Sequence, residues 1–150
     1  MRPLASVRET IRIGCESGLT ANVGHIKTLG VDVWGKADSV LGIMREARAK
    51  GCVVTADQYP WTASGTGLSA ALVPRWAQAG GNDSLKLRIA DATLREKMLV
   101  EMRDNLRRRG GDSTLLLTGG SAAAKSYIGK TLKQAAAAAG KGAASAAMWA

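Results

Sequence analysis

The fold can be predicted from residues 38–56, DSVLGIMREARAKGCVVTA, in which a predicted helix lies directly before a short apolar run. Residues 38–50 predict an amphipathic helix, and one face of it carries Val40, Ile43, Met44 and Ala47. Asp38 or Ser39 can cap its start. We expect Gly51 to end it, because glycine readily adopts the left-handed conformation that follows many helices.

The run after this helix indicates a strand. Residues 52–56 are rich in β-branched side chains and lack polar alternation, which is typical of a strand buried on both faces. Residues 19–26 predict another strand ahead of the helix. A strand, a helix of about 12 residues and a second strand form the pattern of a parallel βαβ unit. We therefore predict an α/β fold with helices on both faces of the sheet.

The remaining segments predict further helices. Residues 5–17 carry apolar side chains four apart, and Gly18 follows them. Residues 68–90 look irregular, whereas residues 92–108 predict a long helix with Thr93 and Glu96 at capping-box spacing. Residues 113–118 are a candidate strand, and the alanine-rich stretch after Gly119 favours helix.

The composition favours a soluble domain. Of 150 residues, 46% are hydrophobic, so the chain can bury a core, and the formal net charge is +9. No leader and no apolar run long enough to cross a bilayer is visible. We expect Cys15 and Cys52 to stay reduced in a cytoplasmic protein, because two cysteines make no disulfide framework.

The positive charge is densest around Arg103 and residues 107–109. Such a cluster can attract phosphate, so a small module that binds nucleic acid or another polyanion is one candidate function. Lys and Arg also favour the last turn of a helix, where backbone carbonyls point outward. We favour that second interpretation over nucleic-acid binding, because no aromatic residues lie among the basic ones.

Polar side chains follow both strands of the predicted βαβ unit. His25 and Lys27 lie at the end of the first strand, and Asp57 and Tyr59 follow the second. Ligands and catalytic groups of α/β folds gather at the carboxyl ends of parallel strands. The residues alone leave the roles open: His25 could be structural or a zinc ligand, and Asp57 a ligand or a turn-holding group. Lys27 could be solvated or bind a carboxylate, and Tyr59 could pack or donate to an oxyanion.

An ordered series of motifs accompanies these residues. The series is GHIK at 24–27, WG at 34–35, ARAKG at 47–51, TADQYPWTAS at 55–64, LVPRW at 72–76 and GG at 80–81, with YIGKTL at 127–132 as a weaker echo. In this order the motifs resemble the N-acyl-D-amino-acid deacylases of the amidohydrolase superfamily. The stronger part of the resemblance covers about residues 20–81.

The resemblance implies a zinc-dependent hydrolase built on a (β/α)8 TIM barrel. It implies that the chain is a partial barrel: residues 1–67 would hold the βαβ portion around strands six and seven, and residues 68–150 a mostly helical insertion before strand eight. By the same resemblance His25 binds zinc, Lys27 and Ser64 hold the substrate carboxylate, and catalytic Tyr59 bonds the scissile carbonyl. The substrate would be an N-acyl-D-amino acid, whose amide bond is hydrolysed.

The sequence departs from the family at several positions. Gly65 stands where the family places a serine, which leaves Ser64 or Thr66 to replace it, and Trp61 replaces a tyrosine. His25 is the only histidine, so the family's other histidine ligands have no counterpart, nor do its bridging cysteine and catalytic aspartate. We therefore expect a fragment that is incomplete or inactive alone, and that self-associates or pairs with a partner subunit through open sheet edges.

Overall fold

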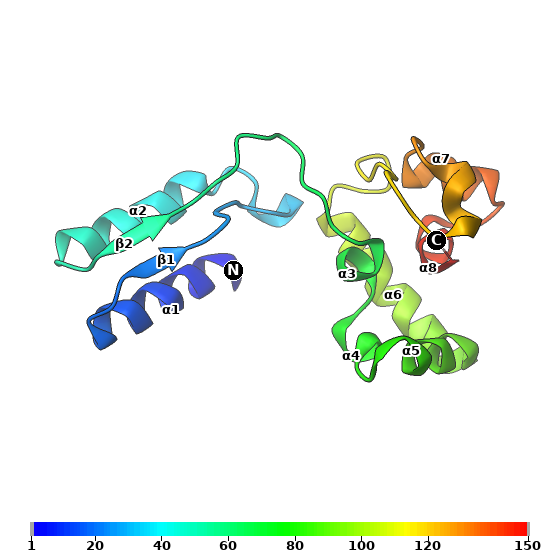
Figure 1. The fold of residues 1–150 in the computed structure, drawn as a ribbon, viewed down its shortest axis with the longest axis horizontal. Helices are drawn as coiled ribbons and strands as arrows, with labels where there is room; N and C mark the ends of the chain where they lie inside the picture. The colour runs from blue at the N-terminus through cyan, green and yellow to red at the C-terminus, as the bar shows by residue number, and fades with distance from the viewer. Residues whose placement is uncertain (1, 150) are drawn as a thin grey trace. The chain divides into compact units, whose positions relative to one another are not determined.

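The computed structural model describes residues 2–149, which divide into two compact units, residues 2–64 and residues 65–149 (Figure 1). The first unit contains the helices α1 (Arg2–Ser17) and α2 (Ala37–Ala49), the strands β1 (Ala21–Val23) and β2 (Val54–Ala56), and the short 3₁₀ helix η1 (Val31–Val33). The strands pair in parallel, with Ala21 opposite Val54 and Val23 opposite Ala56. The predicted βαβ unit is confirmed, with shorter strands than the sequence indicated.

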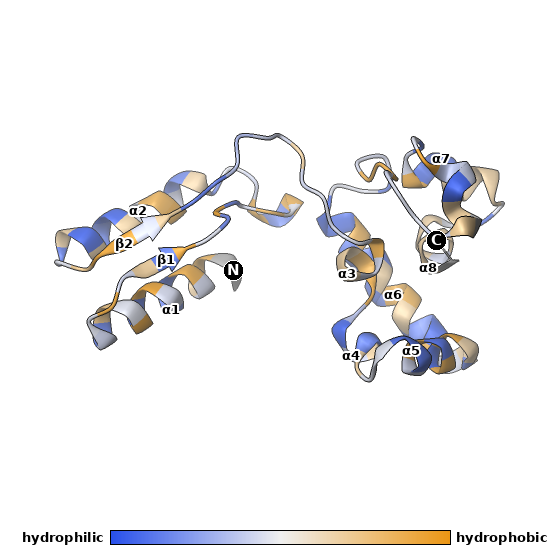
Figure 2. Cartoon of the chain, viewed as in Figure 1, coloured by the Kyte–Doolittle hydropathy of each residue, from blue (hydrophilic) through white to orange (hydrophobic). Residues whose placement is uncertain are grey.

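One face of this two-stranded sheet is covered. Helix α1 contacts β1, α2 contacts β2, and the two helices contact each other, so a single apolar cluster fills the space between helices and sheet. Figure 2 shows α2 alternating between hydrophilic and hydrophobic residues along its coils, as expected of a helix with one buried face. The cluster contains Ile11, Ala21, Val40, Ile43, Met44, Ala47 and Val54.

The opposite face of the sheet is open. Asn22 and Thr55 are exposed there, and Val53, just before β2, is 60% exposed. The prediction of a strand buried on both faces is therefore wrong, because short apolar runs do not reveal how many faces are covered. The predicted caps of α2 are also wrong: the helix begins at Ala37 after Lys36, with no side-chain cap. Gly51 does follow its end, with φ at 86°.

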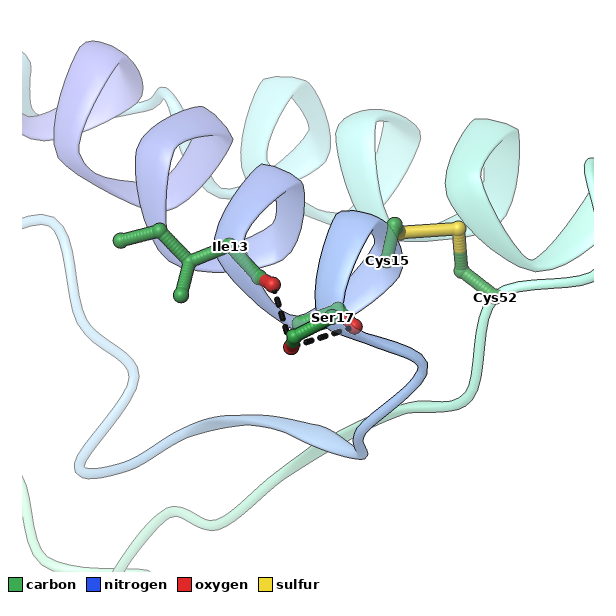
Figure 3. Close-up of a disulfide and its surroundings, with 5 residues drawn as sticks. Ile13, Cys15, Ser17 and Cys52 are labelled. Carbon is green, nitrogen blue, oxygen red and sulfur yellow. Dashed lines mark hydrogen bonds between the residues drawn. A yellow bond between two sulfur atoms is a disulfide. The ribbon is translucent and has the colours of Figure 1, made fainter.

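A disulfide joins the last turn of α1 to the segment that enters β2. Cys15 and Cys52 are 37 residues apart in sequence, and their Cα atoms are 5.3 Å apart (Figure 3). The expectation that both thiols stay reduced is wrong, since packing of α1 against β1 and α2 brings together cysteines that spacing alone could not pair. In the same turn, the Ser17 hydroxyl donates to the Ile13 carbonyl at 2.7 Å.

The second unit is mainly helical. It contains α3 (Leu68–Leu72), α4 (Arg75–Gln78), α5 (Gly81–Ala90), α6 (Ala92–Arg108), η2 (Ala122–Tyr127), α7 (Leu132–Ala138) and α8 (Ala143–Trp149). Its core centres on Leu72, Met98, Met102 and Leu132, which are fully buried. The prediction of α6 is confirmed at both ends, and Gly110 and Gly111 follow it with positive φ.

Several local predictions for this unit are wrong. Residues 68–90 fold into three short helices, because Pro74 and Gly80 interrupt helix without abolishing it. The α6 cap is Asp91, whose carboxylate accepts from the Leu94 N–H at 2.8 Å, so no Thr93 capping box forms. The expected strand at 113–118 is reduced to one antiparallel bridge between Leu116 and Thr131. None of the helices within residues 2–149 is long and apolar enough to cross a membrane.

Candidate functional site

The candidate site lies in the first unit, where the chain leaves β1 and β2. The backbone pairing continues past the strands, because the Ile26 N–H donates to the Asp57 carbonyl at 2.9 Å. This bond holds the segment with His25 and Lys27 beside the segment with Asp57 and Tyr59. The prediction that two neighbouring strand ends bring these residues to one edge is confirmed.

Asp57 organises this edge through both carboxylate oxygens. Its Oδ1 accepts the His25 backbone N–H at 2.7 Å, and its Oδ2 accepts from Asn22 Nδ2 at 3.3 Å. Asn22 is itself fixed, because its Oδ1 accepts from the Thr55 hydroxyl at 2.9 Å. The hydrogen bond from the His25 backbone, aided by the one from Asn22, lowers the pKa of the Asp57 carboxyl. Asp57 therefore holds the turn, one of the two roles that the sequence left open.

His25 adopts an uncommon backbone conformation at this turn. It is the one non-glycine residue among those the structure describes with a positive φ, at 50°. Its ring and the Tyr59 ring form a T-shaped pair, with centroids 6.1 Å apart and planes at 87°. The imidazole is thus placed beside the phenol.

Lys27 completes the group from the same segment as His25. Its Nζ lies 5.0 Å from the centroid of the Tyr59 ring, within the range of a cation–π contact. Lys27 is exposed and Tyr59 is half-buried. In the part of the chain that the structure describes, neither the Lys27 ammonium nor the Tyr59 hydroxyl takes part in a hydrogen bond or ion pair. The edge therefore presents a cation and a phenolic donor to solvent.

Three of the four predicted site residues are brought together. Ser64, the fourth, is exposed at the end of the first unit, and its side chain makes no hydrogen bond within residues 2–149. Sequence reasoning missed the roles of Asn22 and Thr55. The signal that could have found them is their position, since a polar side chain on each of two neighbouring strands suggests a cross-strand pair.

A complete zinc site does not fit the described residues. A catalytic zinc ion needs about three protein ligands, and no group of three His, Cys, Asp or Glu side chains within residues 2–149 could hold a metal. Cys15 and Cys52 are joined to each other, and so offer no thiolate. His25 can contribute one imidazole.

The second unit holds a separate cavity of about 280 Å³, lined by residues of α6, of the loop after it and of α8. Arg103 and Arg107 face it, together with Asp112 and Ser145. Two basic residues of α6 pair with carboxylates of the same helix: Arg103 with Glu96 at 3.3 Å and Arg107 with Asp104 at 3.0 Å. Arg109 Nε donates to the Ala71 carbonyl at 3.0 Å.

Comparison with known proteins finds one informative similarity. No protein-family model matches the chain, and no curated protein matches it. Among solved structures, the chain is similar to the N-acyl-D-glutamate deacylase from Bordetella bronchiseptica, a crystal structure with zinc and a phosphonate inhibitor that mimics the reaction's tetrahedral intermediate. The match has a TM-score of 0.60 at 22% identity, and covers 95% of this chain and 22% of the deacylase. The chain thus has the fold of part of a deacylase, the kind of protein that its sequence motifs resemble.

Proposed function

We propose that this chain carries the substrate-binding edge of an amidohydrolase that cleaves the amide bond of N-acyl-D-amino acids. The observation that supports this proposal is the grouping of Lys27, Tyr59 and His25 at the carboxyl ends of two parallel strands. The similarity to a deacylase supports the class of substrate. An N-acyl-amino acid offers the two groups that this edge can bind, a carboxylate and an amide carbonyl.

Each side chain has a definite task in this proposal. The Lys27 ammonium pairs with the substrate carboxylate while it stays over the Tyr59 ring. The Tyr59 phenol donates a hydrogen bond to the scissile carbonyl. Water addition turns that carbonyl oxygen into an oxyanion, and a donor already in place stabilises the added charge. Ser64 is a further candidate contact for the carboxylate, and would have to approach from its exposed position.

The open face of the sheet supports the proposed partial barrel. In a (β/α)8 barrel, helices cover the outer face of the strands, and catalytic groups come from their carboxyl ends. The strands β1 and β2 have helices on one face, and their carboxyl ends carry the candidate residues. We propose that they correspond to strands six and seven of such a barrel, with residues 65–149 as the insertion that follows.

Zinc enters this proposal only through His25. The imidazole can serve as one ligand, whereas residues 2–149 do not provide the others that a catalytic zinc site needs. The proposal for this chain is therefore substrate binding, and we expect no turnover of N-acyl-D-amino acids by the chain in isolation.

The test is a titration of the ¹⁵N-labelled full chain with N-acetyl-D-glutamate, followed by NMR. We expect saturable shifts at Lys27 and Tyr59. Lys27→Met should weaken binding about fivefold, because an exposed ion pair contributes up to about 1 kcal/mol. Tyr59→Phe keeps the ring and its contact with the ammonium, and should weaken binding by less than Lys27→Met does.

Lys50→Met is the matched control. It removes one positive charge from the same unit, but Lys50 follows α2 and so precedes β2, away from the strand ends that carry the site. If Lys50→Met weakens binding as much as Lys27→Met, the ligand responds to net charge alone and the site assignment is wrong. The absence of saturable shifts at the edge would also contradict the proposal.

A further inference from the structure

The carboxylate of Asp57 connects the end of β2 to β1 and the turn after it, which are distant in sequence. It binds the backbone of His25, which lies 32 residues earlier, and the side chain of Asn22, which lies 35 residues earlier. The Thr55 hydroxyl fixes Asn22 from the neighbouring strand. The carboxylate is therefore held from two sides, and its Oδ1 is directed at one backbone N–H.

That N–H belongs to the residue with the positive φ. A non-glycine residue in the left-handed region is less stable than in the ordinary regions, so a specific contact must hold it there. The Asp57 bond to the His25 N–H, at 2.7 Å, is such a contact, and it is charge-assisted. The φ of His25 sets the direction of its Cα–Cβ bond, and hence whether the imidazole can meet the Tyr59 ring.

We infer that Asp57, held by Asn22, is a positioning residue that orients the His25 imidazole toward Tyr59. Asp57 acts through the backbone of His25, whose N–H its Oδ1 accepts. The inference rests on the proposed function in one respect, that His25 is the group whose direction matters. The geometry itself requires no ligand.

The sequence composition makes the signals of the two rings easy to assign. His25 is the only histidine and Tyr59 is one of two tyrosines, so a nuclear Overhauser effect between a histidine ring and a tyrosine ring can be assigned with the Tyr59→Phe variant. The first readout is this ring-to-ring effect in the full chain. The second is hydrogen exchange of the His25 amide.

Asp57→Ala should abolish the ring-to-ring effect and speed exchange of the His25 amide about tenfold, since a charge-assisted hydrogen bond is lost. Asp57→Asn should keep the ring-to-ring effect, because the amide oxygen can still accept the His25 N–H and the Asn22 amide can turn to pair with the new NH₂. Asn22→Ala should give an intermediate loss. Glu9→Ala removes a carboxylate from an exposed position on α1, and should change neither readout.

The outcomes separate this inference from the proposed function. If Asp57→Ala leaves both readouts unchanged while the amide spectrum of α1 and α2 shows a folded unit, the inference is wrong, whether or not N-acetyl-D-glutamate binds. If Asp57→Asn behaves like Asp57→Ala, acceptance by the side-chain oxygen is not what orients His25, and the inference is also overturned. If the readouts respond as expected but the ligand does not bind, the positioning role is supported and the proposed function fails.

Discussion

Gly14→Ala tests how closely α1 packs against the strand that leads to the site. A Cβ added at Gly14 would lie 2.7 Å from the Cβ of Ala21 and 3.0 Å from its backbone nitrogen. Ala21 cannot move aside easily, because its N–H donates to the Val53 carbonyl at 2.9 Å and its Cα is in register with Val54. Alanine at position 14 should therefore push α1 away from β1.

The expected magnitude follows from two opposing effects. Alanine is favoured over glycine inside a helix by about 1 kcal/mol, whereas overpacking of a tight contact costs about 1–3 kcal/mol. Gly14→Ala should therefore lower the free energy of unfolding by up to about 2 kcal/mol. Gly42, inside α2, has no heavy atom within 4 Å of an added Cβ. Gly42→Ala should raise stability by up to about 1 kcal/mol.

The assay is urea unfolding of the oxidised chain, combined with hydrogen exchange of the β1 and β2 amides. Exchange assigns the change to residues 2–64, because the two units need not unfold together. We expect faster exchange in Gly14→Ala and slower exchange in Gly42→Ala. Equal stabilisation by the two substitutions would refute the close approach of α1 to β1.

Three further predictions concern other features of the chain. Replacing Cys15 and Cys52 together by serine should lower the stability of residues 2–64 by about 2–4 kcal/mol, measured by urea unfolding, because the bond closes a long loop; unchanged stability would contradict this. The pKa of the Asp57 carboxyl is lowered in the folded state, so its hydrogen bond to the His25 N–H should persist at pH values above the ordinary pKa of 3.8. The bond should disappear as the pH falls through the lower, folded-state pKa. The chemical shift of the His25 amide reports this titration, and a midpoint above 3.8 would contradict the prediction. Met102→Ala should destabilise residues 65–149 by about 2–5 kcal/mol, because Met102 is fully buried, and a loss below 1 kcal/mol in thermal unfolding would count against that core.

Sequence patterns predicted the features that depend on neighbouring residues. The apolar positions of residues 38–50 and 92–108 predicted α2 and α6, because a helix buries side chains three and four residues apart. The meeting of His25, Lys27, Asp57 and Tyr59 was also predictable. Parallel strands place their carboxyl ends at one edge, and that rule requires no knowledge of the rest of the fold.

Features that depend on distant contacts could not be predicted in this way. The pairing of Cys15 with Cys52 depends on the packing of α1 against β1 and α2, which cannot be predicted from the spacing of the two cysteines. The open face of the sheet could not be predicted for the same reason, because a threonine at position 55 is compatible with a covered face as well as with an open one. The cap of α6 at Asp91 was missed because Thr93, two residues later, lies at capping-box spacing from Glu96.

The central claim is that the edge formed by Lys27 and Tyr59 binds an N-acyl-amino acid by its carboxylate and its carbonyl. The most direct measurement is the set of intermolecular nuclear Overhauser effects between the full chain and N-acetyl-D-glutamate. The proposed binding mode predicts effects from the acetyl methyl group to the ring protons of Tyr59 and His25, because the methyl group is attached to the carbonyl that the phenol binds. Effects confined to the cavity beside Arg103 and Ser145, or none at a saturating concentration of ligand, would contradict it.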